Sequence, residues 1–329
     1  MTSAEDSPHD AIVDLQPTEA SSLRADVLEG LSRPQKAIPS KYLYDDEGSR
    51  LFDEITELPE YYPTPTEAGI FDACAKEMAQ RVGPRALIIE PGAGNGDKMA
   101  ALVEALDDPV AIVPIDISMD YVKRSAEALA ARFPQLEVVP VCGDFLVPID
   151  VPAPQREPLS RLVFFPGSTV GNFVPAVRHG LLRSFAADAG AGGLVLIGFD
   201  LKKDRETLEA AYDDSAGVTA AFNFNLLARL NRELEADFDP AAFCYVAEWN
   251  EAEGAVEMFL VSRLDQTVQI GVGPDAVEFE FPEGERIHTE SSYKFDVDAF
   301  AEEAAACGLR REAVWTDADG RFAVMLLRA

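Results

Sequence analysis

The sequence predicts an α/β fold with a parallel sheet covered by helices, together with a second α+β domain. Two observations favour this class. Short apolar runs alternate with amphipathic stretches between residues 86 and 200, and that rhythm stops until residue 297. Runs that are apolar on both faces are typical of parallel strands buried beneath helices.

Five buried strands are expected in this region, and helices are expected at 119–133 and 177–187. The strand sequences are ALIIE, VAIVPID, LEVVPV, RLVFF and GGLVLIGFD. After Asp200 the sequence becomes helical and polar and then alternates in VEMFLVSRLDQTVQI, which indicates an insertion with its own sheet. A helix at 297–306 and two strands, REAVW and FAVMLL, joined by the turn sequence DADG, complete the first domain.

The segment before the first strand is also expected to be ordered, because KYLYDDEGSRLFDEITELPEYYPTPTE combines many aromatic residues with prolines. We therefore expect residues 68–202 and 293–329 to form the first domain. Residues 1–67 and 203–292 are expected to form the second, facing the edge of the sheet where the strands end and where such folds bind ligands.

Composition excludes several classes of partner. The chain of 329 residues has 58 acidic and 28 basic residues and a formal charge of −30, which repels nucleic acid and anionic membranes. No apolar run approaches the roughly 18 residues that span a bilayer, so a cytoplasmic monomer is expected. The four cysteines and three histidines are dispersed, so no metal site is expected.

A glycine-rich loop follows the first strand in LIIEPGAGNGDK, with Gly92, Gly94 and Gly96 at alternate positions. Glycines allow a nucleotide-like ligand to lie against the backbone, although a connector without a ligand has the same composition. A dinucleotide fingerprint needs a third glycine where this chain has Asp97. That acid and Glu90 disfavour a pyrophosphate, and hence a nicotinamide oxidoreductase, but suit the cationic sulfonium and amine of S-adenosylmethionine (SAM).

The next two strands also end in acids. Asp116 can accept hydrogen bonds from both ribose hydroxyls, while Asp144 can accept from the adenine amino group and Phe145 can cover the ring. Each acid alone could be a helix cap. The ordered set resembles the pattern of class I methyltransferases, which have a Rossmann-like sheet.

Four separated blocks extend this resemblance over nearly the whole chain from about Ser40. They are SKYLYDDEGSRLFDEITELPEYYPT, GSTVGN at 167–172, AYDDSAGVTAAFNFNLLARLNREL and IHTESSYKF. The chain resembles the histidine-specific, SAM-dependent N-alpha-methyltransferases of ergothioneine biosynthesis.

The resemblance implies two sets of residues. The implied cofactor-binding residues are Tyr44, Phe52, Gly92, Lys98, Asp116, Asp144 and Phe145. The implied substrate-binding residues are Tyr61, Gly167, Thr169, Asn172, Tyr212, Met258, Glu290 and Ser292, and four of these, Tyr61, Thr169, Asn172 and Tyr212, are the implied catalytic residues.

The resemblance also implies roles. Asn172 and Tyr212 would hold the substrate carboxylate, while Glu290 and Ser292 would recognise the imidazole. A neutral imidazole has one N–H and one lone pair, which a carboxylate and a hydroxyl can satisfy together. Ser291 lies between these two residues, so either serine could face the ring.

The implied reaction is methylation of the α-amine of L-histidine to N-alpha-trimethylhistidine (hercynine), with SAM as co-substrate and no metal. One alternative is a class I methyltransferase that acts on another amino acid or a small amine. Another is a catalytically silent module that binds SAM and regulates a partner.

Overall fold

The computed structural model describes residues 13–14, 23–93, 97–146 and 149–329 and divides the chain into two compact units. Unit 1 consists of Met1–Ala20, Pro65–Leu201 and Phe295–Ala329, and unit 2 consists of Ser21–Thr64 and Lys202–Lys294. Each unit is therefore assembled from separate stretches of sequence. Ser21–Thr64 of the N-terminal segment shares unit 2 with the insertion after the fifth predicted strand, whereas Met1–Ala20 belongs to unit 1.

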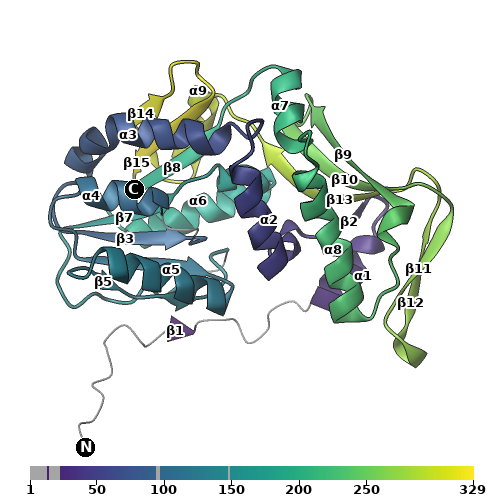
Figure 1. Ribbon diagram of the computed structural model, residues 1–329. Helices are drawn as coiled ribbons and strands as arrows, with labels where there is room; N and C mark the ends of the chain where they lie inside the picture. The colour runs from purple at the N-terminus through teal and green to yellow at the C-terminus, as the bar shows by residue number, and fades with distance from the viewer. Residues whose placement is uncertain (1–12, 15–22, 94–96, 147–148) are drawn as a thin grey trace, which may run out of the picture. The chain divides into compact units, whose positions relative to one another are not determined.

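A nine-stranded sheet forms the centre of unit 1, in the order β1-β6-β4-β3-β7-β8-β15-β14, with β5 paired to β4 (Figure 1). The strands are β1 (Val13–Asp14), β3 (Ala86–Pro91), β4 (Ala111–Asp116), β5 (Glu137–Val138), β6 (Val141–Cys142), β7 (Ser160–Phe165), β8 (Leu194–Asp200), β14 (Arg310–Thr316) and β15 (Phe322–Arg328). The pairs from β1 to β8 are parallel, whereas β15 is antiparallel to both β8 and β14. The sheet is thus mixed at one edge.

One predicted strand is divided in two. The sequence LEVVPV was expected to form a single strand, but β5 and β6 are separated at Val139 and Pro140. Proline has no N–H to donate to a strand ladder, and Val139 N still donates to Ile112 O at 2.9 Å. The interruption therefore follows from the proline.

Helices cover both faces of this sheet. Phe164 contacts Phe71 of α3 (Pro63–Val82), whereas the next residue, Phe165, contacts Phe185 of α6 (Pro175–Ala189), with ring centroids 5.7 and 4.8 Å apart. Successive strand residues point to opposite faces, so α3 and α6 lie on opposite sides. The α3 side also carries α4 (Asp97–Ala105) and α5 (Met119–Arg132), and the other side carries α9 (Val297–Ala306).

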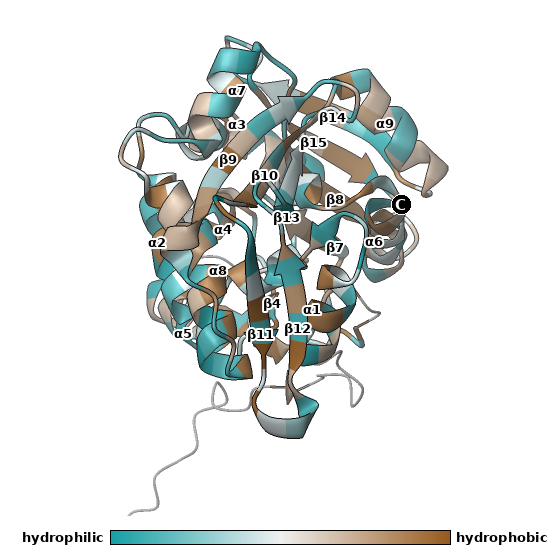
Figure 2. Cartoon of the chain, turned by 90° about the vertical axis from the view of Figure 1, so that its right-hand side faces the viewer, coloured by the Kyte–Doolittle hydropathy of each residue, from teal (hydrophilic) through white to brown (hydrophobic). Residues whose placement is uncertain are grey.

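Unit 2 has its own sheet, as predicted, in the order β2-β13-β10-β9. Its strands are β2 (Lys36–Ala37), β9 (Phe243–Asn250), β10 (Ala255–Ser262) and β13 (Arg286–Tyr293), and a separate hairpin joins β11 (Gln266–Ile270) to β12 (Val277–Phe281). Both hairpin strands mix hydrophobic and hydrophilic residues (Figure 2). The alternating sequence VEMFLVSRLDQTVQI predicted β10 and β11, whereas β2, β9, β12 and β13 were not predicted.

Helices α1 (Leu23–Leu31), α2 (Asp46–Thr56), α7 (Arg205–Tyr212) and α8 (Val218–Leu234) complete unit 2. Its hydrophobic core combines Leu43 and Ile55 from the N-terminal segment with Leu226 of α8 and Leu260 of β10. Neither stretch of sequence alone supplies that core, which explains why the aromatic N-terminal segment is ordered.

Candidate functional site

In unit 1, three strand ends meet at one edge of the sheet. Gly92 N, just after β3, donates to Ile115 O of β4 at 2.8 Å, and Gly143 N, just after β6, donates to Asp116 O at 2.9 Å. The backbone therefore ties the glycine loop to the acid-bearing ends of the two neighbouring strands. Asp116 and Asp144 each also accept a backbone N–H two residues later, from Ser118 and Leu146, both at 2.9 Å.

The first glycine of the loop is required by its conformation. Gly92 has φ of 72°, and a Cβ there would lie 3.5 Å from Cε1 of the Phe145 ring. Phe145 itself packs edge-on against Phe165 and Phe173. The sequence-predicted residues Gly92 and Phe145 are thus neighbours, while Gly94 and Gly96, and the side chain of Asp97, lie outside the described residues.

Glu90 carries a buried carboxylate at the end of β3. It is 3% exposed, and among the described residues its Oε2 atom has no hydrogen-bond partner. Burial raises its pKa to about 8, with the charge of Asp116 acting in the same direction and Lys98 opposing it. An orphaned buried carboxylate suits a ligand that brings positive charge and N–H donors. The residues of this edge therefore fit SAM, which has both a sulfonium and an ammonium group.

A second buried carboxylate connects two predicted site residues. Glu67 of α3 is 0% exposed, accepts from Gly167 N at 2.9 and 3.0 Å and pairs with the ammonium of Lys98. The same side chain lies against Gly198 of β8, where a Cβ would come within 2.0 Å of Glu67 Oε1. Glu67 thus positions both Lys98 and the turn after β7, although sequence reasoning did not single it out.

The turn after β7 is held in a strained shape. Gly167 and Ser168 have φ of 84° and 60°, and left-handed backbone is rare for a serine. Ser168 Oγ accepts from Asp200 N at 2.9 Å, which fixes this conformation, and a 3-10 turn (Thr169–Asn172) follows. This arrangement brings the predicted residues Gly167, Thr169 and Asn172 into one short loop.

In unit 2, Glu290 and Ser292 alternate along β13 and share one face. Glu290 pairs across the ladder with Met258, so these two side chains are on the same side of the sheet. Ser292 Oγ lies 2.8 Å from Tyr212 Oη, whereas Ser291 Oγ lies 2.8 Å from His288 Nε2. Ser292, not Ser291, therefore shares the face of Glu290.

A β-bulge opposite Met258 and Phe259 determines which residues of β13 lie on this face. Phe259 pairs with His288, which leaves Thr289 as the extra residue. The Thr289 hydroxyl donates to Asn223 Oδ1 at 2.6 Å, and its oxygen also lies 3.1 Å from Met258 O. Such bulges re-aim side chains, and this one places His288 and Glu290 on opposite faces.

Aromatic residues pack around Glu290. Tyr44 forms a hydrogen bond with the Glu290 side chain, and its ring contacts Phe52, which in turn contacts Tyr61. Tyr61 contacts Tyr212, with ring centroids 6.1 Å apart. Burial raises the pKa of Glu290 to about 8, opposed by Lys294 and by the Tyr44 hydrogen bond. All predicted site residues of unit 2 are therefore connected, including Tyr44 and Phe52, which the resemblance assigned to the cofactor.

Helix capping explains how Tyr212 is presented. Tyr212 ends α7, and two residues later the Asp214 carboxylate accepts from Val218 N and Thr219 N at the start of α8, at 2.9 and 2.8 Å. The AYDD motif is thus a tyrosine followed by a helix cap. Tyr245 Oη donates to Tyr212 O at 2.7 Å and holds the same corner.

Sequence reasoning also missed Lys294, which is 3% exposed and whose Nζ donates to Tyr212 Oη and Ser292 Oγ at 2.6 and 2.9 Å. The signal was present in TESSYK, because residues 290, 292 and 294 alternate and share a face of an extended strand. Glu67 gave no comparable signal, since its partners lie 31 and 100 residues away in sequence.

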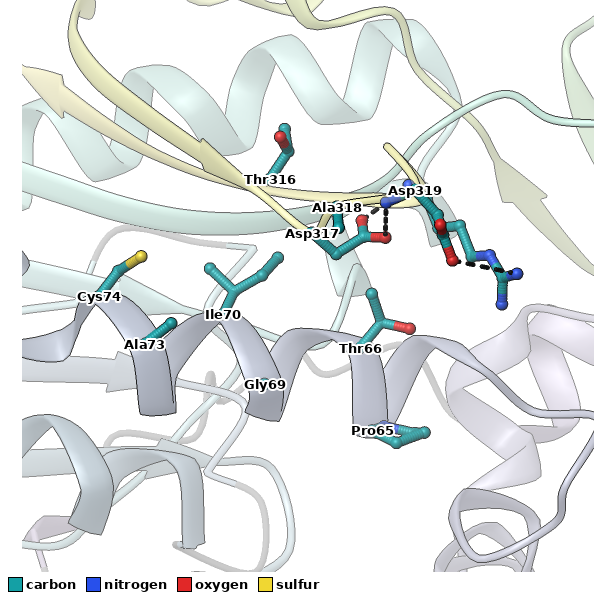
Figure 3. Close-up of a pocket in the computed structure, with 11 residues that line it drawn as sticks. Pro65, Thr66, Gly69, Ile70, Ala73, Cys74, Thr316, Asp317, Ala318 and Asp319 are labelled. Carbon is teal, nitrogen blue, oxygen red and sulfur yellow. Dashed lines mark hydrogen bonds and ion pairs between the residues drawn. The ribbon is translucent and has the colours of Figure 1, made fainter.

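The remaining features of the described chain point to no other site. An open pocket in unit 1 lies between α3 and the β14–β15 turn, where Asp317 accepts backbone N–H groups of that turn (Figure 3). None of the described residues predicted to bind cofactor or substrate lines it. Across the described ranges, no group of three or more His, Cys, Asp or Glu side chains is arranged to hold a metal. No helix in the same ranges has the length and hydropathy needed to cross a membrane.

The parallel sheet, its antiparallel β15 and the acids at adjacent strand ends identify unit 1 as the Rossmann-like domain of a class I SAM-dependent methyltransferase. The chain belongs to the family of histidine-specific, SAM-dependent methyltransferases, which matches residues 23–329.

Curated relatives agree with this assignment. Histidine N-alpha-methyltransferase of Mycolicibacterium smegmatis is 42% identical over 311 residues, covering 93% of this chain and 95% of the relative. The protein of the same name from Mycobacterium tuberculosis is 42% identical over 309 residues, covering 93% and 94%. Ergothioneine biosynthesis protein 1 of Schizosaccharomyces pombe is 31% identical over 271 residues, covering 78% of this chain and 34% of that longer protein.

Proposed function

We propose that this protein methylates the α-amino group of L-histidine with SAM, giving N-alpha-trimethylhistidine (hercynine) in ergothioneine biosynthesis. The observation that carries the substrate assignment is the polar face of β13, where Glu290 and Ser292 are buried two residues apart beside Met258. The names of the mycobacterial and yeast relatives support the same substrate and pathway.

Unit 1 is proposed to bind the co-substrate. Asp116 would accept the ribose hydroxyls, Asp144 and Phe145 would hold the adenine, and Gly92 would allow close approach to the backbone. Glu90 would accept from the cationic part of the methionine moiety, and Lys98, held by Glu67, would place an ammonium near its carboxylate. When bound, SAM supplies the electrophilic methyl group.

Unit 2 is proposed to read the amino acid. A neutral imidazole needs one acceptor and one donor, and the carboxyl of Glu290 beside the hydroxyl of Ser292 provides both. Tyr212 would donate to the substrate carboxylate, and Asn172 of unit 1 remains a predicted ligand of that carboxylate. Met258, 1% exposed and paired with Glu290, would form an apolar wall beside the ring.

The α-amine must be neutral to attack, and an α-amino group has a pKa of about 8 in peptides and higher in free amino acids. We propose that it loses its proton to solvent before each transfer, with the less polar surroundings favouring the neutral form. The rings of Tyr44 and Tyr61 would then stabilise the methylated cation through cation–π contact. Orientation of the amine is the protein's main contribution to the rate.

Mass spectrometry of histidine incubated with the protein and SAM tests the proposal directly. We expect products heavier by one, two and three methyl groups. The remaining nineteen amino acids and small amines should be assayed in parallel, because faster turnover of any of them would favour the alternative methyl acceptor. No turnover with any acceptor, by a protein that binds SAM, would favour the silent regulatory module.

Replacement of Glu290 tests the substrate-reading role. In Glu290→Ala, kcat/KM should fall far more for histidine than for phenylalanine or tryptophan, because a site built on hydrogen bonds rejects substrates that cannot make them. Glu257→Ala is the matched control, since Glu257 lies on the opposite face of the neighbouring strand. Equal losses for all three amino acids in Glu290→Ala would assign Glu290 a structural role.

We further propose that the protein acts as a cytoplasmic monomer without a nucleic-acid partner. Its charge of −30 opposes both self-association and phosphate binding, and its four cysteines, all within the described residues, form no disulfide, as is usual in a reducing compartment. Light scattering at physiological salt should give the mass of one chain, 35.7 kDa. A doubled mass would contradict the monomer.

A further inference from the structure

The ammonium of Lys294 contacts two of the residues assigned to the substrate, Tyr212 and Ser292. Lys294 follows β13 directly, is 3% exposed and lies 4.5 Å from the centroid of the Tyr212 ring. Lysine is almost never buried to this extent without a compensating arrangement. Lys294 Nζ donates to two hydroxyl oxygens, Tyr212 Oη and Ser292 Oγ.

The directions of these hydrogen bonds are fixed by chemistry. An ammonium can only donate, so both hydroxyl oxygens accept from Lys294. The two hydroxyls are also 2.8 Å from each other, and only one hydroxyl hydrogen can occupy that bond. The other hydrogen must be donated to a third acceptor. Lys294 thus turns a tyrosine and a serine into an oriented donor group.

The positive charge of Lys294 favours an anionic ligand, as do the hydroxyl hydrogens that it orients. Glu290 precedes Ser292 by two residues on the same face of β13, and the ammonium of Lys294 opposes the rise of its pKa. The ammonium of Lys294 therefore acts on Glu290 as well as on the two hydroxyls to which it donates. An anionic group that accepts from Tyr212 would gain from this field in a poorly hydrated site.

We propose that Lys294 is a positioning residue for amino-acid recognition: its ammonium orients the hydroxyls of Tyr212 and Ser292 and selects for the carboxylate of the substrate. This inference rests on the proposed function. It adds a fixed positive charge to a carboxylate site that the sequence described only by a phenol and an amide.

The test compares the binding of histidine and histidinamide by calorimetry. These ligands differ in the negative charge of the head group. A variant that weakens both ligands equally leaves the ratio of their affinities unchanged, so a change in this ratio reports recognition of the carboxylate. In Lys294→Met, histidine affinity should fall by about 10- to 100-fold, the range for losing a charged hydrogen bond. Histidinamide affinity should fall much less, and SAM affinity should not change.

Two further variants define the mechanism. Lys203→Met is the matched control, because Lys203 Nζ also donates to a tyrosine hydroxyl, that of Tyr62 at 2.7 Å, and lies over its ring. It should keep the parent's ratio of affinities. Adding Tyr212→Phe to Lys294→Met should weaken histidine binding little further, because the lysine acts through that tyrosine.

Each outcome decides the inference. Equal losses for both ligands, or no loss for histidine, would overturn it and leave Lys294 a structural residue. Thermal melting checks folding, and if Lys294→Met does not fold, Lys294→Gln removes the charge while keeping an N–H donor, with the same expected ratio. If the parent binds histidine but does not methylate it, the proposed function fails while the affinity ratio still decides the inference. Failure of the parent to bind histidine would overturn both.

Discussion

Buried acidic side chains define the candidate site of unit 1, and Glu90 shows that burying such a group lowers the stability of the fold. Its carboxyl is buried with an unsatisfied oxygen among the described residues, which natural structures rarely tolerate outside functional sites. Stability given up at the end of β3 is consistent with a site prepared for a cationic ligand.

Replacing Glu90 should therefore stabilise the ligand-free protein. Its pKa rises from 4.5 to about 8 on folding. The folded state is therefore not penalised below pH 4.5, where the side chain is protonated in both states. It loses stability as pH rises from the unfolded pKa of 4.5 toward the folded pKa of about 8. In Glu90→Gln this loss disappears, and the variant should be more stable than the parent by roughly 2–3 kcal/mol at neutral pH. Thermal melting between pH 4 and 8, without SAM, measures the difference.

Glu127→Gln, at an exposed position of α5, provides the control and should follow the parent's pH dependence. Glu90→Gln should also bind SAM more weakly. A variant that melted like the parent at every pH would show that Glu90 is well solvated in solution.

Asp116 should control co-substrate affinity. Its carboxylate is held at the end of β4 by Ser118 N, and burial raises its pKa to about 6. In Asp116→Ala the ribose hydroxyls would lose their acceptor, so SAM binding should weaken by about 1–3 kcal/mol. Calorimetry measures this, with Asp120→Ala on the exposed first turn of α5 as the control. Unchanged affinity would assign the strand end to another ligand.

At the scale of elements, short turns and a bulge determine which side chains face a ligand. The turn after β7 needs left-handed backbone at Gly167 and Ser168, and the bulge at Thr289 decides which face of β13 carries Glu290. With regular backbone at either place, the side chains that follow would point in other directions. Neither can be read from hydrophobic periodicity.

Gly167→Ala should separate backbone strain from function. Gly167 has φ of 84°, and an added Cβ would lie 3.4 Å from Lys98 Nζ and 3.6 Å from Thr169 Oγ1. Gly192 has nearly the same backbone, φ of 79°, but nothing within 4 Å of a Cβ. Both alanine variants should lose about 1–2 kcal/mol of stability. Only Gly167→Ala should also lower kcat/KM for methylation.

Chemical denaturation and steady-state kinetics on both variants test this. If Gly192→Ala impaired methylation as much as Gly167→Ala, the effect would come from general strain, and the turn after β7 would lose its special role.

Elements were predictable where local pattern decides them. The strands of unit 1 are apolar throughout because both faces are covered, so they stand out in the sequence. The division between β5 and β6 depends on Pro140, which lacks the N–H that a continuous strand would need. By contrast, β9 is half-buried along most of its length, and its pairing with β10 depends on residues far away in sequence.

The same limit applies to the candidate site. Resemblance located the residues in GSTVGN and TESS, because those blocks are contiguous. It did not locate Glu67, whose contacts join α3 to α4 and to the turn after β7. Such residues are defined by the folded unit, since no short stretch of sequence contains their partners.

At the scale of the whole molecule, the charge of −30 should make stability depend on salt. Acids exceed bases by more than two to one, so repulsion among carboxylates outweighs what the surface ion pairs gain. Raising NaCl from about 0.02 to 0.5 M screens this repulsion, and the melting temperature should rise by several degrees. Sucrose is the control for exclusion of solute from the surface. A fall in melting temperature with NaCl would show that attractive pairs dominate.

The interrupted layout of the two units also has a consequence for synthesis on the ribosome. The core of unit 2 joins residues 27–62 to residues 208–287, and the chain leaves this unit at Thr64 and returns at Lys202. At about 5–20 residues per second, the roughly 140 intervening residues take about 7–28 s to emerge. During that time the aromatic N-terminal segment has no α8 to pack against. The nascent chain therefore exposes tyrosines and phenylalanines for many seconds, and such transient apolar surface favours aggregation until α8 has been synthesised.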